Sequence, residues 1–359
     1  MDYHGRQAAA HMCCGRGGVD ALLVSHLPNI RYLTGFSGSN ALLVLEAARG
    51  AVLFTDGRYR VQARHQVRGA SVNVPPKGDL WTAAAGRAAK LKHVGLEFEH
   101  VSLAQRARWL RLWDGGAKGL KNCSGWIEQL RTIKESAEIE ALRRAVRLAS
   151  SAFLPTLRHY RPGMAETELV GWLEFGLRRA GAEGLAFDTI LAGGPHGAMV
   201  HAQPDGRALP RRGFVVMDYG LVLAGYHSDM TRTPHIGAAG RKAQTVYRAV
   251  REAQAAAIAA VRAGVAAAAV DAAARRVLQH AGYGRYFPHS TGHGVGLEIH
   301  EGPRLAATSK DRLKAGQVIT IEPGVYIPGW GGVRLEDVVL VTPTGAEILT
   351  PTPKELIIL

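Results

Sequence analysis

The chain has 359 residues, of which 47% are apolar, and at the usual domain size of about 100 to 200 residues it can form two domains. Its formal charge of +14 does not indicate nucleic-acid binding, because Lys and Arg are scattered and no zinc finger or aromatic RNA-binding motif occurs. Three cysteines, no apolar run of about 18 residues and no signal-peptide core predict a cytoplasmic protein that is neither disulfide-bonded nor membrane-bound.

The first third of the chain has the pattern of an α/β domain. The segment that contains the adjacent Cys13 and Cys14 is expected to form a loose end. Short apolar runs then alternate with helix-like stretches. The runs, each an expected strand, are residues 21–24, 41–45, 51–54 and 94–98. Strands interleaved with helices predict an α/β domain over residues 1–130.

A second domain is expected over residues 131–359. Thr132 and Glu135 have the spacing of a helix capping box, and apolar residues from Ile139 to Phe153 then recur at helical intervals. The pattern predicts a long helix at the start of this domain.

The second domain contains an internal repeat. Residues 161–181 resemble residues 262–282 at a constant offset of 101 residues, which pairs Gly163 with Gly264. Each copy is followed by a segment with the pattern of a β-hairpin. Two related halves, each a helix pair plus a hairpin, would face each other around a shared cleft.

Two acidic residues flank the turn of the first predicted hairpin. Asp218 ends an apolar strand, and Asp229 lies as far after the midpoint of Leu223 and Ala224 as Asp218 lies before it. A tight turn there would place the carboxylates opposite each other, where like charges destabilise a strand pair. A bound cation between the carboxylates, or a salt bridge to an arginine, would relieve this repulsion.

The same arrangement occurs in the second hairpin, where Glu322 and Glu336 are symmetric about Gly329. Burying four unpaired carboxylates is costly, and two matched hairpins favour metal ions over arginine partners. His293 is the fifth candidate ligand, because it lies in a glycine-rich segment with three histidines, residues 289–301. Five such ligands suit two divalent ions about 3.5 to 4 Å apart. An oxygen-rich set without thiolates predicts Mn²⁺ first, with Co²⁺, Fe²⁺ or Zn²⁺ as alternatives.

These motifs resemble the creatinase-like or "pita-bread" metallopeptidases, and among them the Xaa-Pro aminopeptidase and prolidase branch. The resemblance is carried by HSTGHGVGLEIHE, VMDYG, HSDMTRT, TIEPGVYI and GVRLEDVVLVT. HLPNIRYLTGFSGSNALL and LFTDGRY are similar to the small domain that precedes the catalytic one, which leaves roughly the first eighteen residues outside the resemblance. It implies an α+β pita-bread catalytic domain with a pseudo-two-fold repeat, preceded by a smaller α/β creatinase-like domain.

The resemblance also implies roles for the five candidate ligands. Asp218 would bind one metal ion, His293 and Glu322 the other, and Asp229 and Glu336 would bridge both. Glu322 would in addition take a proton from the nucleophile, a metal-bridging hydroxide, and pass it to the leaving nitrogen.

Four further residues match positions around the family's cleft. His201 and His300 would contact the scissile peptide and act as catalytic residues. His289 would bind substrate on the proline side, and Arg334 would steady an acidic ligand from behind.

The implied activity is removal of the residue that precedes a proline at a peptide N-terminus, as in an Xaa-Pro aminopeptidase. A prolidase restricted to Xaa-Pro dipeptides is the main alternative. A methionine aminopeptidase would not need the first 130 residues, a creatinase lacks these ligands, and a non-enzymatic peptide-binding module would have lost them. The expected partners are proline-containing peptides and a second copy in a homodimer, with no nucleic acid and no membrane.

Overall fold

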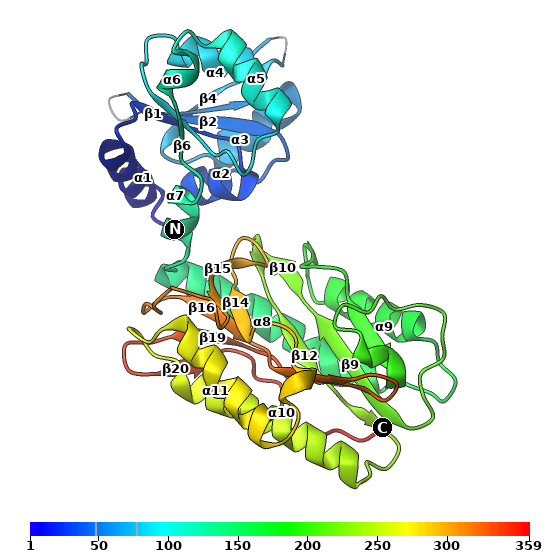
Figure 1. The fold of residues 1–359 in the computed structure, drawn as a ribbon. Coiled ribbons are helices and arrows are strands. Elements are labelled where there is room, and N and C mark those ends of the chain that lie inside the picture. Colours follow the sequence, from blue (N-terminus) through cyan, green and yellow to red (C-terminus); the bar gives the residue numbers. More distant parts are fainter. Residues whose placement is uncertain (47–48, 77) are drawn as a thin grey trace. The chain divides into compact units, whose positions relative to one another are not determined.

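The computed structural model describes residues 1–46, 49–76 and 78–359, and the chain divides into two compact units, Met1–Arg131 and Thr132–Leu359 (Figure 1). Within those ranges, every helix falls short of the length or the apolar character that crossing a membrane requires.

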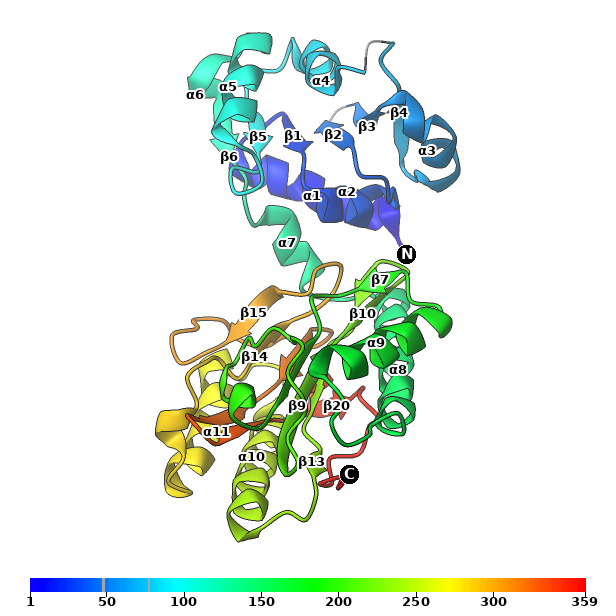
Figure 2. The ribbon, with the colours of Figure 1, turned by 90° about the vertical axis from the view of Figure 1, so that its right-hand side faces the viewer.

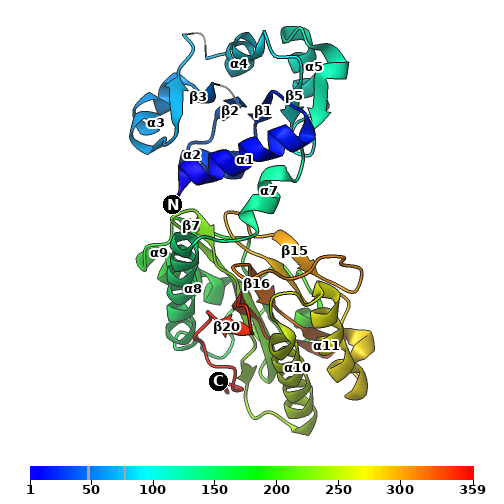
Figure 3. The same ribbon diagram turned by 90° about the vertical axis from the view of Figure 1, so that its left-hand side faces the viewer.

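Unit 1 is built on one mixed sheet of six strands in the order β4-β3-β2-β1-β5-β6. The strands are β1 Ala21–Val24, β2 Ala41–Glu46, β3 Gly50–Thr55, β4 Ala70–Asn73, β5 Val94–Leu96 and β6 Leu120–Asn122. The helices are α1 Tyr3–Gly17, α2 Leu27–Thr34, α3 Arg60–Gln66, α4 Leu80–Ala88, α5 Leu103–Leu112, α6 Gly116–Gly119 and α7 Trp126–Arg131. Helices α1 and α2 lie on one side of the sheet, and α4 and α5 lie on the other (Figures 2 and 3). The four predicted strands are confirmed as β1, β2, β3 and β5, whereas the half-exposed β4 and the short β6 lack the apolar pattern that would have predicted them.

The expectation of a loose end around Cys13 and Cys14 was wrong. Asp2 caps helix α1 by accepting a hydrogen bond from the Gly5 amide, and Gly18, with φ of 60°, ends it. The helix buries Arg6, which donates a hydrogen bond to the Tyr32 carbonyl, and it also buries Cys14. Because polar residues occupy part of the buried face, hydrophobic periodicity did not reveal this helix.

Unit 2 opens with helix α8, Ser136–Leu157, one turn later than the sequence predicted. The capping box is formed by Glu135 and Glu138, not by Thr132 and Glu135. The Lys134 amide donates a hydrogen bond to the Gly316 carbonyl. This long-range bond holds the residues before Ser136 outside the helix that the sequence predicted there.

The internal repeat is confirmed by the two helices that it predicted. Helix α9 spans Glu166–Arg179 and helix α11 spans Ala267–His280, so their starts and their ends both lie 101 residues apart. The paired glycines share a left-handed conformation, with φ of 84° at Gly163 and 85° at Gly264. This conformation favours glycine, which explains why the same residue marks both copies.

The strands of unit 2 lie between two helix pairs, α8 with α9 and α10 (Arg241–Ala260) with α11 (Figure 2). In the first half they are β7 Gly184–Leu185, β8 Ile190–Gly193, β9 Gly213–Tyr219, β10 Leu221–Leu223, β11 Tyr226–His227, β12 Met230–Arg232 and β13 His235–Ile236. In the second half they are β14 Gly292–Gly294, β15 Glu301–Leu305, β16 Val318–Ile321, β17 Gly324–Ile327, β18 Gly331–Arg334, β19 Asp337–Val341 and β20 Ala346–Ile348. Each helix pair buries its own apolar core against the strands of its half. The opposite faces of the strands are thereby left to form a site.

Candidate metal centre

The second hairpin places Glu322 and Glu336 opposite each other, as the symmetry about Gly329 predicted. Strands β17 and β18 pair Gly324 with Arg334, and strands β16 and β19 pair Ile321 with Asp337. The pairing continues in the same register from one pair of strands to the other. Glu322 and Glu336 lie between the two pairs and are opposite each other in this register. Two acidic side chains are therefore held side by side by strand pairs on either side.

The first hairpin differs from the prediction by one residue. Its two-residue turn is Ala224-Gly225, with φ of 51° and 79°, which is the conformation of a type I′ turn. Asp218 therefore pairs with Thr231, whereas the prediction placed it opposite Asp229. The error arose because the turn was centred on residues 223 and 224, and Ala224 gives no sequence signal for a positive φ. Asp229 nevertheless faces the same cavity as Asp218.

Two glycines hold His293 on strand β14 close to neighbouring backbone. A Cβ atom on Gly292 would lie 2.0 Å from the Thr320 carbonyl oxygen, and one on Gly294 would lie 2.1 Å from that of Gly302. The His293 Nδ1 atom forms a 3.0 Å hydrogen bond with the Gly294 carbonyl oxygen, so Nδ1 carries the proton. The unprotonated Nε2 atom is the one that can bind a metal ion.

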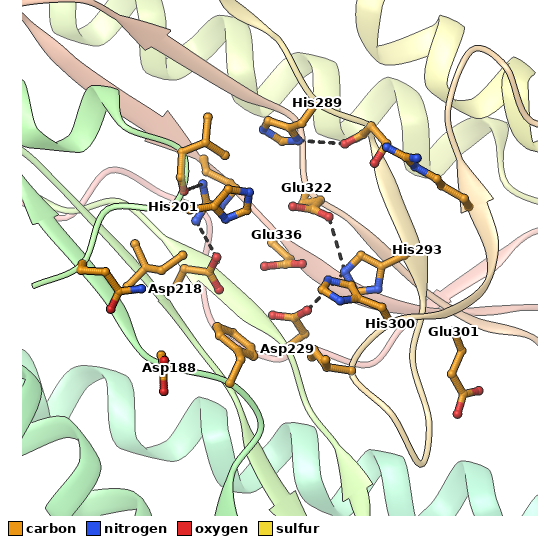
Figure 4. Close-up of a pocket in the computed structure, with 18 residues that line it drawn as sticks. Asp188, His201, Asp218, Asp229, His289, His293, His300, Glu301, Glu322 and Glu336 are labelled. Atoms are coloured by element: carbon orange, nitrogen blue, oxygen red, sulfur yellow. Dashed lines mark hydrogen bonds and ion pairs between the residues drawn. The ribbon is translucent and has the colours of Figure 1, made fainter. Parts of the chain in front are cut away.

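His293 points at the carboxylates, as Figure 4 shows. Its Nε2 atom lies 3.5 Å from Asp229 Oδ2 and 3.5 Å from Glu322 Oε1. Ligand atoms of Asp229, His293 and Glu336 all lie within 4.8 Å of one another. Side chains from both halves of the repeat therefore meet at one point.

Arg334 is the cation that the structure itself supplies to this cluster. Its buried guanidinium donates hydrogen bonds to Asp218 Oδ2, to the Tyr326 hydroxyl at 2.6 Å and to Thr231 Oγ1 at 3.1 Å. The Asp218 Oδ1 atom is buried and has no hydrogen-bond partner among the described residues. One arginine facing four carboxylates leaves excess negative charge and an unsatisfied oxygen, which fits bound divalent cations.

The electrostatics of the cluster agree with this imbalance. Burial, reinforced by the neighbouring carboxylates, raises the pKa of Asp229 and of Glu336 well above the usual range. Burial also raises the pKa of Glu322 to about 8. It lowers the pKa of His293 to about 4, which keeps the imidazole neutral at ordinary pH. In the absence of metal ions these carboxylates resist ionisation. Divalent cations bound beside them would lower their pKa values and favour the ionised form.

These pKa shifts predict how the stability of the metal-free protein depends on pH. Because the folded-state pKa of Glu322 is raised from 4.5 to about 8, its contribution to stability is present at low pH and is lost as pH rises toward 8. The lowered pKa of His293 has the opposite effect, but only between about 4 and 6.5. The melting temperature measured with a chelator should therefore fall from about pH 6.5 to about pH 8.

A matched variant tests this pH dependence. Glu322→Gln removes one of the three carboxylates with a raised pKa and should reduce the fall in melting temperature, while Asp229 and Glu336 account for the remainder. An unchanged slope in the variant would contradict the assignment to Glu322.

The cluster lines a cavity of about 620 Å³. All nine residues singled out in the sequence face it: His201, Asp218, Asp229, His289, His293, His300, Glu322, Arg334 and Glu336. His201 and His300 are exposed at its surface, and the His300 ring centroid lies 4.4 Å from that of His293 (Figure 4). Apolar side chains that include Phe187, Ile190 and Ile299 complete the wall. The cavity is therefore lined by charged side chains in one part and by apolar side chains in another.

The sequence analysis missed Thr231 and Tyr326. The Thr231 hydroxyl donates to Glu336 Oε2 at 2.8 Å, and the Tyr326 hydroxyl lies 2.9 Å from His289 Nε2. Both hydroxyls also accept hydrogen bonds from Arg334, so they connect the acidic residues to the arginine and the histidine. A signal existed for Thr231, since a residue two positions after Asp229 on a strand shares its face.

Comparison with known proteins agrees with this geometry. The model of metallopeptidase family M24 matches residues 140–343. An Xaa-Pro dipeptidase from Pyrococcus horikoshii is 33% identical over 347 residues, which cover 95% of this chain and 95% of the relative. The solved structure of an Xaa-Pro dipeptidase from Bacillus anthracis is 35% identical with a TM-score of 0.96, covering 99% of this chain and 100% of the other. The solved structure of an X-Pro aminopeptidase from Thermotoga maritima is 34% identical with a TM-score of 0.89, covering 95% of this chain and 98% of the other.

The model of the creatinase/prolidase N-terminal domain matches residues 6–133. The resemblance therefore extends into helix α1, and leaving roughly eighteen residues outside it was wrong. The predicted combination of a creatinase-like domain and a pita-bread domain is confirmed. The chain belongs to metallopeptidase family M24.

Proposed function

We propose that this metallopeptidase is an Xaa-Pro dipeptidase that uses two divalent metal ions. The observation that carries the proposal is the meeting of four carboxylates and one imidazole in a single cavity. Relatives named Xaa-Pro dipeptidase match nearly the whole chain and favour the dipeptidase over the aminopeptidase that the sequence analysis preferred. Hydrolysis of a dipeptide whose second residue is proline is therefore the proposed reaction.

Five residues would hold the metal ions. Asp218 would bind one ion, His293 and Glu322 the other, and Asp229 and Glu336 would be shared by both. When bound, the ions would polarise the peptide carbonyl and lower the pKa of a water molecule. Mn²⁺ is the proposed metal because the ligand set is rich in carboxylate oxygens and has no thiolate.

The protein's own side chains have separate tasks in this proposal. The carboxylate of Glu322 accepts a proton from the attacking water molecule as the water oxygen bonds to the peptide carbon, and it delivers this proton to the proline nitrogen as the bond between that carbon and the nitrogen breaks. The imidazoles of His201 and His300, exposed at the cavity surface, hold the peptide and donate to the carbonyl oxygen as negative charge develops there. His289, whose Nε2 atom lies 2.9 Å from the Tyr326 hydroxyl, would bind the proline side of the substrate. A homodimer and a cytoplasmic location stay predictions.

A substrate panel tests this function. Protein reconstituted with Mn²⁺ should hydrolyse Ala-Pro with a kcat/KM at least about tenfold above that for Ala-Pro-Ala, and Ala-Ala should be a poor substrate. Release of free alanine is the measurement. Equal turnover of Ala-Pro-Ala would return the assignment to an aminopeptidase, and equal turnover of Ala-Ala would refute proline selectivity.

A further inference from the structure

A second cluster with metal-binding side chains lies in unit 1, which holds none of the nine cavity residues. His26 directly precedes helix α2, His100 lies between strand β5 and helix α5, and Glu128 lies on helix α7. The His100 Nε2 atom is 3.0 Å from Glu128 Oε1, and the His26 Nδ1 atom is 3.7 Å from the same oxygen. Three separate elements thus bring two imidazoles to one carboxylate.

The geometry of the cluster suits a divalent ion. The two imidazole rings are stacked with centroids 3.6 Å apart and planes 4° apart, and one nitrogen atom of each ring lies within 3.7 Å of Glu128 Oε1. One ligand atom from each residue lies within 4.8 Å of the others. Zn²⁺ bonds of about 2.0 to 2.2 Å to nitrogen and oxygen would require the two rings to tilt out of this stack, because each imidazole nitrogen binds a metal ion through a lone pair in its ring plane.

The carboxylate is held in place by a buried amide. Asn29 Nδ2 donates to Glu128 Oε1 at 2.6 Å and also to Glu97 Oε1 at 2.7 Å. Arg131 Nη1 donates to Asn29 Oδ1 at 2.7 Å, which fixes the orientation of the amide. Ligands in metal sites are commonly oriented by such outer hydrogen bonds.

The cluster also leaves room for further ligands. Glu128 Oε2 is buried and has no hydrogen-bond partner among the described residues. The side chains of His26, His100 and Glu128 are 16%, 25% and 29% exposed, so water can reach them. His100 also lines a cavity of about 470 Å³. A metal ion here would gain its remaining ligands from water or from a molecule in that cavity.

We propose that His26, His100 and Glu128 form a second metal site, which binds a Zn²⁺-type divalent ion. Two imidazoles and one carboxylate are ligands that Zn²⁺ accepts, and they differ from the carboxylate-rich set of unit 2. The ion would join α2, α7 and the segment between β5 and α5. The role of this ion would be structural. The proposal of this second site does not depend on the proposed peptidase reaction.

Protection of the histidines from chemical modification tests the site in the full-length protein. Diethyl pyrocarbonate modifies accessible imidazoles, and mass spectrometry of the digested protein locates each modified residue. Zn²⁺ should slow modification of His26 and His100 by at least about tenfold, since metal bonds occupy the reacting nitrogens. The exposed His65, which is outside the cluster, should be unaffected. Protection of His26 and His100 no greater than that of His65 would overturn the proposal and leave a hydrogen-bonded cluster only.

Variants provide an independent measurement. His100→Gln and Glu128→Gln should each bind one Zn²⁺ ion fewer than the unchanged protein by elemental analysis, while His65→Gln should bind the same number. Asn29→Ala should keep the site but weaken its affinity by about 10- to 100-fold, because it removes an orienting hydrogen bond. Equal Zn²⁺ content in folded His100→Gln, checked by circular dichroism, would contradict the site. Mn²⁺-dependent hydrolysis of Ala-Pro reports on the unit 2 site separately.

Discussion

Replacement of Glu336 by Gln is expected to abolish Mn²⁺-dependent hydrolysis and to reduce the bound metal below two ions per chain. In the proposed site Glu336 is shared by both ions, and an amide supplies neither the charge nor the second anionic oxygen. The metal-free variant should nevertheless melt at a higher temperature than the metal-free parent near neutral pH. The reason is that burial and the neighbouring acids raise the pKa of Glu336, so its ionised form opposes folding.

Elemental analysis after Mn²⁺ loading and calorimetry in the presence of chelator measure the two effects. Glu252→Gln is the matched control, because Glu252 is exposed on helix α10 and lies outside the cavity. It should retain activity, metal content and melting temperature. Two bound ions and normal turnover in the Glu336 variant would refute a shared ligand at this position.

The repeat and the second hairpin were predictable because both depend on glycines whose conformation few other residues adopt. Gly163 and Gly264 have the same φ in both copies, and Gly329 has a φ of 71° at the centre of its turn. Because few other residues adopt a positive φ, such glycines mark turns in the sequence, and the symmetry about Gly329 gives the register of the second hairpin. The register of Glu322 and Glu336 followed from this symmetry.

The first hairpin was harder to predict because its turn depends on a residue that rarely takes a positive φ. Ala224 has a φ of 51°, and the Ala224 and Gly225 amides donate hydrogen bonds to the carboxylate of Glu183, which stabilise the turn. Glu183 lies about 40 positions earlier, where local patterns cannot connect it to the turn. The one-residue error moved Asp229 away from the position directly opposite Asp218.

The hydrogen bonds that organise the site were also invisible in the sequence. Thr231 contacts Glu336 and Arg334, which are about 100 positions away along the chain and belong to the other half of the repeat. Motifs identify the charged members of the cluster, since chemistry restricts them to a few residue types. The neutral hydroxyls between them are recognised only when the two halves are brought together.

Replacement of His300 by Ala is expected to lower kcat for Ala-Pro by about 10² to 10⁴, the range for a positioned proton-transfer or oxyanion-stabilising group. Metal content should stay at two ions per chain, because His300 is exposed at the cavity surface and is not among the proposed ligands. His201→Ala should behave in the same way. KM should change less than kcat if these imidazoles act on the developing charge.

Steady-state kinetics and elemental analysis of the same preparations separate a catalytic role from a metal-binding role. His280→Ala is the matched control, because His280 is an exposed histidine at the end of helix α11, outside the cavity. Its kcat should equal that of the unchanged protein. Loss of metal from the His300 variant would assign this histidine to the ligands, and an unchanged kcat would remove it from the reaction. A large fall in kcat with both ions retained is the result expected from a side chain that contacts the peptide.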